Sequence, residues 1–400
     1  MVLSTVYIGH EECDALKIAE YPESYTERLA RAKKVHGHAN CDCNADRLRL
    51  VIRKIAELNR LSLWPNEGTK HAPLCIFYRN EIHDQVARSF ARQSIIESVD
   101  GLVTITPAFD LSLKLSKNAV TKGPQPGKTA AQSVTRRKAG LTALLQFLWE
   151  RSKLNSIKSR PPDFSKTTYR LWLAMRDCKI GKADMDSVTF LPGMSRQSPN
   201  WHSQFLTRLK KSDTDKKIYG VVIGKLVSLV KAQYGYCYTV NSLGALLYVD
   251  DALQSKLATS FPQAFQAVAQ ESGLNVFLAA QVEITSGGNL KARDCGFIVT
   301  SRDFIPVDSM YEAQFSNKLV DEDRAFDKPL KVENGLLPDF VLLDTPTPTF
   351  VEVWGMNTDD YKLRRAEKVQ AYANLNHVLL EWDAANEDPM PQLPPIGTNK

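Results

Sequence analysis

The clearest hydrophobic pattern in the chain is helical and covers residues 141–155. Apolar positions recur there at the spacing that places them on one face of an α-helix, and they are Leu141, Leu144, Leu145, Leu148 and Trp149. A second helical pattern covers residues 167–178, after the pair Pro161-Pro162, which separates the two helices. We expect both helices to pack into a core. Because basic residues flank both helices, the alternative is that they form a DNA-binding helix-turn-helix.

After residue 217 the pattern changes to that of β-strands. Runs rich in β-branched and aromatic residues are typical of strands, and they cover residues 218–230, 234–240, 275–285 and 295–307. A helical stretch at residues 250–273 interrupts them. These patterns predict a central region of the α+β class. We find no phosphate-binding loop, dinucleotide fingerprint or catalytic triad in it.

The C-terminal pattern predicts a hairpin followed by a helix. Residues 340–343 and 350–354 indicate two short strands, and the turn-forming segment DTPTPT lies between them. The helix is expected to begin near Thr358 or Asp359, either of which could cap it, and to run through Tyr372.

Length and composition are those of an ordinary soluble protein. The 400 residues suffice for two or three domains of about 100–200 residues each. They are 43% hydrophobic and 24% charged. The chain has no apolar run long enough to span a membrane, and acids stand near its start in place of the basic region of a secretory signal. We therefore expect a cytoplasmic protein without a membrane partner.

The positive charge is small but unevenly distributed. The chain has 51 Lys and Arg against 45 Asp and Glu, a net charge of +6, which alone is too weak to indicate nucleic-acid binding. However, residues 111–149 contain no acid at all. The segment 111–140 is rich in Lys, Gly, Pro, Ser and Thr, which predicts a basic linker. It is either a flexible spacer or an arm that contacts phosphates.

The linker divides the chain into four predicted regions. A Cys- and His-containing module covers residues 1–110 and the linker covers 111–140. The α+β central region covers 141–300, and a C-terminal domain covers 301–400.

Four side chains of the N-terminal module could together bind a zinc ion. The chain has seven cysteines and no sign of secretion, so a disulfide framework is not expected. Zinc takes four tetrahedral ligands, commonly delivered as two close pairs. Cys41 and Cys43 form one pair, and His71 and Cys75 form the other. We predict a structural zinc site on these residues. Reduced thiols that cluster by chance and, less so, a redox thiol are the alternatives.

Two acids of the predicted hairpin suggest a second metal site. Asp339 lies at the mouth of the first strand, and Glu352 lies on the second strand, on the same face as Trp354. Two carboxylates from adjacent strands with a lysine close by suit Mg²⁺, a hard cation that prefers oxygen ligands. Asp339 and Glu352 are therefore candidate magnesium ligands.

The same stretch resembles the PD-(D/E)xK nuclease superfamily. Pro338-Asp339 matches the PD pair and Glu352 the second carboxylate, while Glu312 suits the acid that this superfamily carries on a preceding helix. One position departs from the pattern, because Trp354 stands where the superfamily has its lysine. Some members place the lysine on the following helix, where Lys368 is the candidate.

The resemblance implies a restriction-endonuclease-like domain with Glu312, Asp339, Glu352 and Lys368 as catalytic residues. The chemistry would be Mg²⁺-dependent hydrolysis of phosphodiesters. Candidate nucleic-acid contacts are Arg364 and Arg365, to phosphates, and Trp354, on which a base could stack. A degenerate, non-catalytic fold and an unrelated hairpin with surface acids are the alternatives.

Most of the chain also resembles an uncharacterised family encoded on bacterial plasmids and integrative conjugative elements. The segments that carry this resemblance are CDC, PNEGTKHAPLC, LLQFLWERSKLN, LPDFVLLDT and VEVWG, with Tyr361, Arg365 and Lys368. It implies a mobile-element context and no established activity. The leading interpretation is a metal-dependent nuclease with a zinc-stabilised N-terminal module. Two other interpretations remain open: a nucleic-acid-binding protein without catalytic activity, and a protein-binding accessory factor.

Overall fold

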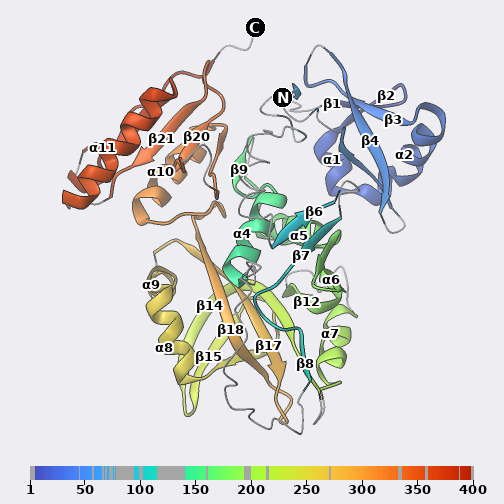
Figure 1. Ribbon diagram of the computed structural model, residues 1–400, viewed down its shortest axis with the longest axis vertical. Helices are drawn as coiled ribbons and strands as arrows, with labels where there is room; N and C mark the ends of the chain where they lie inside the picture. The colour runs from blue at the N-terminus through green and yellow to red at the C-terminus, as the bar shows by residue number, and fades with distance from the viewer. Residues whose placement is uncertain are drawn as a thin grey trace, which may run out of the picture.

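The computed structural model shows three bodies: an N-terminal module, a large central body and a C-terminal module (Figure 1). It describes a defined set of residues, namely 5–44, 46–55, 58–64, 67, 70–71, 75, 77, 94–98, 102–114, 140–158, 161–192, 200–212, 216–269, 272–331, 336–355, 359–386 and 388–397. Most of the predicted basic linker, residues 115–139, lies outside this set.

The N-terminal module is an antiparallel sheet with two helices. Its strands lie in the order β2-β1-β3-β4-β5, with bounds β1 Thr5–Ile8, β2 Glu11–Asp14, β3 His38–Cys41, β4 Leu48–Ile55 and β5 Leu58–Leu63. Helices α1, Ala15–Glu20, and α2, Pro22–His36, join β2 to β3. Gly37, at a φ of 77°, ends α2 in the left-handed conformation that glycine adopts without strain. The core holds the alternate inward residues of the strands, among them Val6 and Leu50.

Short strands and helices connect this module to the central body. A sheet in the order β11-β10-β7-β6 comprises β6 Ile95–Glu97, β7 Val103–Ile105, β10 Cys178–Ile180 and β11 Ala183–Asp184. β8, Ser112–Lys114, pairs with β13, Lys216–Ile218. The helices here are α4 Leu141–Arg151, α5 Phe164–Met175, α6 Met185–Val188 and α7 Trp201–Leu209. α4 and α5 confirm the two helical patterns.

Five strands of the central body close into a barrel. They are β14 Gly220–Ala232, β15 Gly235–Val240, β16 Leu246–Val249, β17 Asn275–Ile284 and β18 Leu290–Thr300. They pair in the order β14-β15-β16-β18-β17, and β17 pairs back onto β14. β16 and β18 are parallel, and the other neighbours are antiparallel. β12, Thr189–Phe190, extends the sheet beside β14.

β14 closes the barrel because it pairs with two neighbours in succession. Its first half pairs with β17 and its second half with β15, and the register shifts between Leu226 and Ser228, where the strand changes partner. A bulge of this kind sharpens the local twist of a strand. Gly224 lies at this bend, where a Cβ atom would come within 2.5 Å of the Val240 side chain. Glycine is therefore needed for the strands to approach.

Two helices lie between β16 and β17, on one side of the barrel (Figure 1). They are α8, Asp251–Ser260, and α9, Pro262–Ala269. The sequence pattern predicted one helical stretch here; Phe261 and Pro262 break it, since proline provides no amide for helix continuation.

The C-terminal module is a mixed sheet with helices α10 and α11. Its elements in chain order are α10 Met310–Asp321, β19 Phe326–Asp327, β20 Phe340–Leu342, β21 Thr349–Val353, α11 Asp359–Asn374 and β22 Val378–Trp382. The sheet order is β22-β21-β20-β19-β9, with β22 parallel to β21. β20 and β21 form the expected hairpin, and α11 the expected helix.

The strand β9, Ser156–Ile157, comes from the central region and pairs with β19. This pairing crosses the domain boundary predicted at residue 300. The mixed α/β class is confirmed. In the described part of the chain, no helix combines the length and apolarity needed to cross a bilayer.

Candidate metal centre and acid–lysine site

The four predicted zinc ligands lie together in the N-terminal module. Their ligand atoms all lie within 4.8 Å of one another. The Cys41 and Cys75 Sγ atoms are 3.5 Å apart, and His71 Nδ1 lies 3.2 Å from Cys43 Sγ and 3.6 Å from Cys75 Sγ. This is the compact set of three thiols and one imidazole that suits a tetrahedral zinc ion.

Local structure brings the two pairs together. Cys41 ends β3, and the turn after it is tied to the second segment by the Asn44 side chain, which donates to the carbonyl of Lys70 at 2.5 Å. The Phe77 amide donates to Cys75 Sγ at 3.4 Å, which would support a thiolate there.

The cluster is largely buried. Cys41, His71 and Cys75 are at most 2% exposed and Cys43 is half-buried. The neighbouring thiols and burial raise the pKa of Cys41 above its ordinary value. His71 Nδ1 faces the thiols and is the nitrogen that would bind a metal, while Nε2 is buried without a partner among the described residues. All seven cysteines are free thiols.

The four predicted catalytic residues meet in the C-terminal module, with Lys328 between two of them. Glu312 lies in the first turn of α10, whose N-cap Ser309 accepts from the Glu312 amide at 3.1 Å. Its Oε2 accepts from Lys328 Nζ at 2.7 Å and from the Asp308 amide at 3.0 Å. Lys328 Nζ also lies 3.6 Å from Asp339 Oδ1. An ammonium group therefore joins the helix acid to the strand acid.

Asp339 lies just before β20, and Glu352 lies on the neighbouring strand β21. Phe340 pairs with Val351, and the Asp339 amide donates to the Val351 carbonyl at 3.0 Å. Asp339 Oδ2 accepts from the Val353 amide at 2.7 Å, which fixes this carboxylate at the hairpin edge. Glu352 Oε2 accepts from Lys368 Nζ at 2.7 Å, and its Oε1 accepts from Tyr372 Oη at 2.5 Å.

Burial perturbs the acids of this site. Burial, with a smaller contribution from Asp339, raises the pKa of Glu352 to about 7, although Lys368 and Tyr372 oppose the shift. Burial also raises the pKa of Glu312. Burial disfavours the charge of Lys328, but the surrounding carboxylates outweigh it and raise its pKa. A carboxyl group that titrates near neutrality can exchange a proton during a reaction.

The predicted magnesium site is less complete than the zinc site. Among the described residues, the Cys/His cluster is the only group of three or more Cys, His, Asp or Glu ligand atoms close enough for one ion. Both oxygens of Glu352 are hydrogen-bonded, and Lys328 lies beside Asp339. Magnesium binding therefore has no support beyond the proximity of the two acids.

The predicted nucleic-acid contacts have other partners. Trp354 is 4% exposed. Its Nε1 donates to Glu381 Oε2 at 2.8 Å, and the Arg365 guanidinium carbon lies 5.1 Å from the ring centroid. Arg365 pairs with Glu381 and Asp383. Neighbouring side chains therefore cover the Trp354 ring in this structure, and base stacking on it stays a prediction. Arg364 is exposed.

The sequence analysis did not identify three residues of this site, Lys328, Asp308 and Glu381. No motif marks them, since Lys328 follows the two-residue strand β19, and Glu381 lies on β22, which reaches the site only because β22 adds beside β21. Tyr372 lies one turn after Lys368 on α11, and both side chains contact Glu352.

Together the fold and the two sites define a mixed α/β protein with a compact Cys/His cluster and a separate acid–lysine site. The chain belongs to the family described as protein of unknown function, DUF1173, which matches residues 14–385. No curated protein matches it.

Proposed function

We propose that the C-terminal module is a divalent-cation-dependent phosphodiesterase that acts on nucleic acid. The observation that carries this proposal is the meeting of Glu312, Asp339, Glu352 and Lys368, which come from α10, the start of β20, β21 and α11. This is the order of helix acid, strand acids and helix lysine that the nuclease resemblance implies. The restriction-endonuclease-like fold is part of the proposal.

Each residue has a role that its contacts suit. Asp339 and Glu352 would hold the cation, and Glu312 would support it from α10. A bound Mg²⁺ supplies charge neutralisation at the phosphate and a more acidic water. Lys368, 28% exposed and hydrogen-bonded to Glu352, would orient the attacking water or offset charge in the transition state. Lys328 would neutralise Glu312 and leave Asp339 to the metal.

The barrel supports nucleic acid as the partner. It has five strands with the third and fifth parallel, a first strand shared between two neighbours, and its helices between strands three and four. This is the connectivity of the barrel fold that binds oligonucleotides and oligosaccharides. Such barrels can hold single strands by stacking and phosphate contacts.

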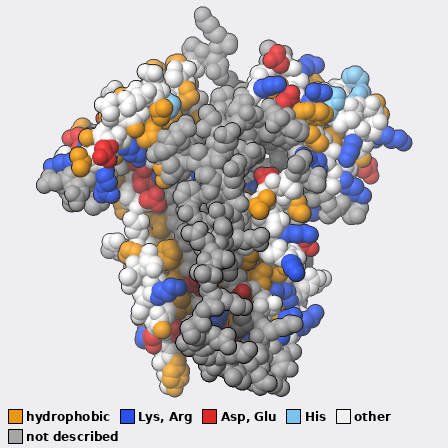
Figure 2. Space-filling view, in the orientation of Figure 1, with side chains coloured by type: hydrophobic (Ala, Val, Ile, Leu, Met, Phe, Trp, Pro, Cys, Tyr) orange, Lys and Arg blue, Asp and Glu red, His pale blue; other side chains and the backbone are white. Residues whose placement is uncertain are grey.

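The surface charge favours a strand held at a few points over a broad electrostatic contact. Figure 2 shows the described Lys and Arg side chains spread over several elements, among acidic and apolar ones. On the barrel, Lys231, Lys256 and Lys291 each pair with an aspartate. The basic linker would add phosphate contacts. The mobile-element context and the cytoplasmic location remain predictions.

The test is a cleavage assay of the full chain on single- and double-stranded DNA and RNA, with Mg²⁺ or Mn²⁺. We expect cleavage by the wild type, loss of activity on chelation, and a decrease of at least about a hundredfold in Asp339→Ala. The matched control is Asp321→Ala, which removes an exposed acid of the same module, side chain 61% exposed, and should retain activity. Absence of cleavage in the wild type with every substrate and both metals would refute the proposal.

A second candidate is a nucleic-acid-binding protein whose nuclease-like site is inactive. The observation that favours it is Lys328, whose ammonium lies between Glu312 and Asp339 and neutralises them without a metal. Trp354 at the lysine position of the motif agrees with it. This candidate predicts strand binding that weakens steeply with salt, without cleavage. Absence of binding at low salt would leave a protein-binding accessory role.

A further inference from the structure

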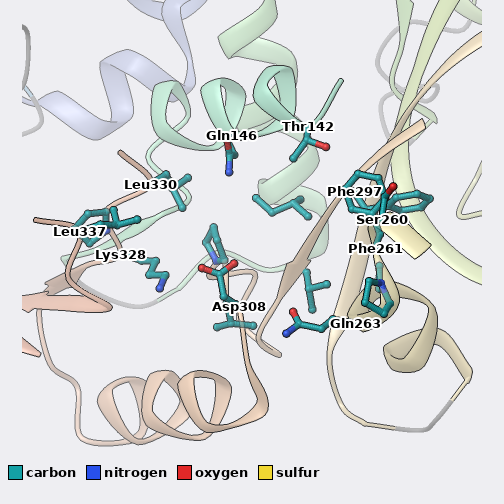
Figure 3. A pocket seen from close by; sticks show the side chains of 17 residues that line it. Thr142, Gln146, Ser260, Phe261, Gln263, Phe297, Asp308, Lys328, Leu330 and Leu337 are labelled. Atoms are coloured by element: carbon teal, nitrogen blue, oxygen red, sulfur yellow. The ribbon is translucent and has the colours of Figure 1, made fainter. Parts of the chain in front are cut away.

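A cavity of about 360 Å³ lies between the barrel and the C-terminal module (Figure 3). Asp308 and Lys328 reach it from the module, and Thr142 and Gln146 of α4 lie on the opposite side. The junction of α8 with α9 and residues of β18 complete the lining. Small-molecule sites in proteins have volumes of about 300–1,000 Å³. The cavity therefore has room for one flat heterocycle with a part of its attached chain.

The wall on the barrel side is aromatic and electrically neutral. Phe297 is 4% exposed and Phe261 is half-buried, with ring centroids 5.1 Å apart at an angle of 61°. Gln146 and Gln263 are exposed at the rim, and neither side chain has a hydrogen-bond partner among the described residues. A carboxamide offers both donors and an acceptor. Aromatic rings beside free carboxamides match the faces and the edge of a nucleobase.

The opposite wall leads directly to the acid–lysine site. Lys328 Nζ and the Asp308 amide both donate to Glu312 Oε2, at 2.7 and 3.0 Å. These two residues thus border the cavity and the proposed catalytic acids at once. A nucleotide with its phosphodiester at Asp339 and Lys328 would have the cavity beside it for its base.

We propose that this cavity binds a nucleobase of the strand whose phosphodiester lies at the acid–lysine site. The inference rests on the proposed function and adds to it a requirement for an unpaired or extruded base, because a base stacked within a duplex has no route into a pocket of this size. The substrate class is accordingly single-stranded nucleic acid, or a duplex at a distorted position.

The test uses the full chain in EDTA, so that binding is measured without cleavage. Fluorescein-labelled DNA and RNA strands of about 15 nucleotides, long enough for a barrel-type site, carry one abasic residue that is moved along the strand. Fluorescence anisotropy gives the affinity for each strand. Loss of one stacked base removes about 1–3 kcal/mol, which is about 5- to 150-fold in affinity. We expect this loss at one position of the strand only.

The variants Phe261→Ala and Gln146→Ala should reduce that penalty to less than about twofold, since the partner of the missing base is already absent. Gln204→Ala, an exposed glutamine on α7, is the matched control and should keep the full penalty. Phe261 packs on Phe297, so Gln146→Ala provides the variant that leaves the core intact.

Two results would overturn the inference. One is a strand with no abasic-sensitive position, and the other is a penalty that both variants leave unchanged. Metal-dependent cleavage by the same preparation would then keep the proposed function. Absence of both binding and cleavage would refute the inference and the proposed function together.

Discussion

Loss of one ligand from the Cys/His cluster should unfold the N-terminal module and leave the barrel folded. Cys41→Ser is the sharpest change, because Cys41 is fully buried, ends β3 and lies 3.5 Å from Cys75 Sγ. Serine preserves the size of the side chain but replaces a thiolate by a hydroxyl, which is a poor ligand for zinc.

The expected loss of stability follows from a comparison of the free energy of zinc binding with the stability of so small a module. The core of this module is small and includes Cys41 and Cys75 themselves. Structural zinc contributes about 10–16 kcal/mol of apparent binding free energy in small zinc domains, whereas a whole domain is stable by only about 5–15 kcal/mol. Because the two free energies are of similar size, loss of most of the metal affinity should remove the stability of the module.

The assay combines metal analysis with hydrogen exchange on the purified full chain. The wild type should carry about one zinc per chain and Cys41→Ser much less. Amides of β1–β5 should lose protection in the variant, while those of β17 and β18 keep it. Cys13→Ser, in the same module but outside the cluster, should change neither measurement. A wild type with less than about one tenth equivalent of metal, or a Cys41→Ser protein with full metal content, would refute the reasoning.

Three further predictions concern stability. Lys328→Met should lower the free energy of unfolding, measured by chemical denaturation, by about 3–5 kcal/mol, because it leaves buried carboxylates without their cation. The control Lys318→Met removes an exposed ion pair within one helix and should lower it by less than about 1 kcal/mol. Equal losses in the two variants would contradict the argument. Burial raises the pKa of Glu352 to about 7, so the contribution of this group to the free energy of unfolding is complete below the ordinary carboxyl pKa and is lost as the pH rises through 7. In EDTA, the free energy of unfolding of the C-terminal module should therefore decrease by as much as about 3 kcal/mol between pH 5 and pH 8. Glu352→Gln should flatten this pH profile. Gly296→Ala places a Cβ atom 2.3 Å from a backbone nitrogen of α4 and should lower the melting temperature through a cost of about 1–3 kcal/mol, whereas Gly140→Ala, with open space around it, should not.

The local elements were predictable where one face of each is buried and the pattern is long. α4 repeats its apolar residues over three turns, and all of Leu141, Leu144, Leu145, Leu148 and Trp149 are buried. The hairpin of β20 and β21 was equally clear, because turn residues separate two apolar runs. Closure of the barrel was not predictable, since it depends on β14 pairing with β17 across fifty or more residues, and the sequence carries no local signal for that pairing.

The Cys/His cluster was identifiable because a zinc site restricts both the residue types and their pairing along the chain. Lys368, the partner of Glu352, was predicted from the nuclease resemblance. Lys328, the partner of Glu312 and Asp339, was not predictable, because a buried charge requires only some opposite charge nearby and places no constraint on its position in the sequence. Lys328 satisfies Glu312 from a segment sixteen positions away, and Glu381 satisfies Trp354 from a different strand. The two partners that the sequence did not mark, Lys328 and Glu381, thus lie on segments without a motif of their own.

This pairing bears on how the acid–lysine site would accept a cation. Three carboxylates, of Glu312, Asp339 and Glu352, share two ammonium groups, of Lys328 and Lys368. One negative charge is left over, and only while Glu352 is ionised. A divalent cation would therefore bind best above the raised pKa of Glu352, near 7, because below that pH it would first have to displace the proton of Glu352. Metal affinity should increase with pH across neutrality in the wild type. In Lys328→Met the excess negative charge is larger, so the same metal should bind more tightly; weaker binding would mean that Lys328 holds the acids in place for the cation and does not compete with it.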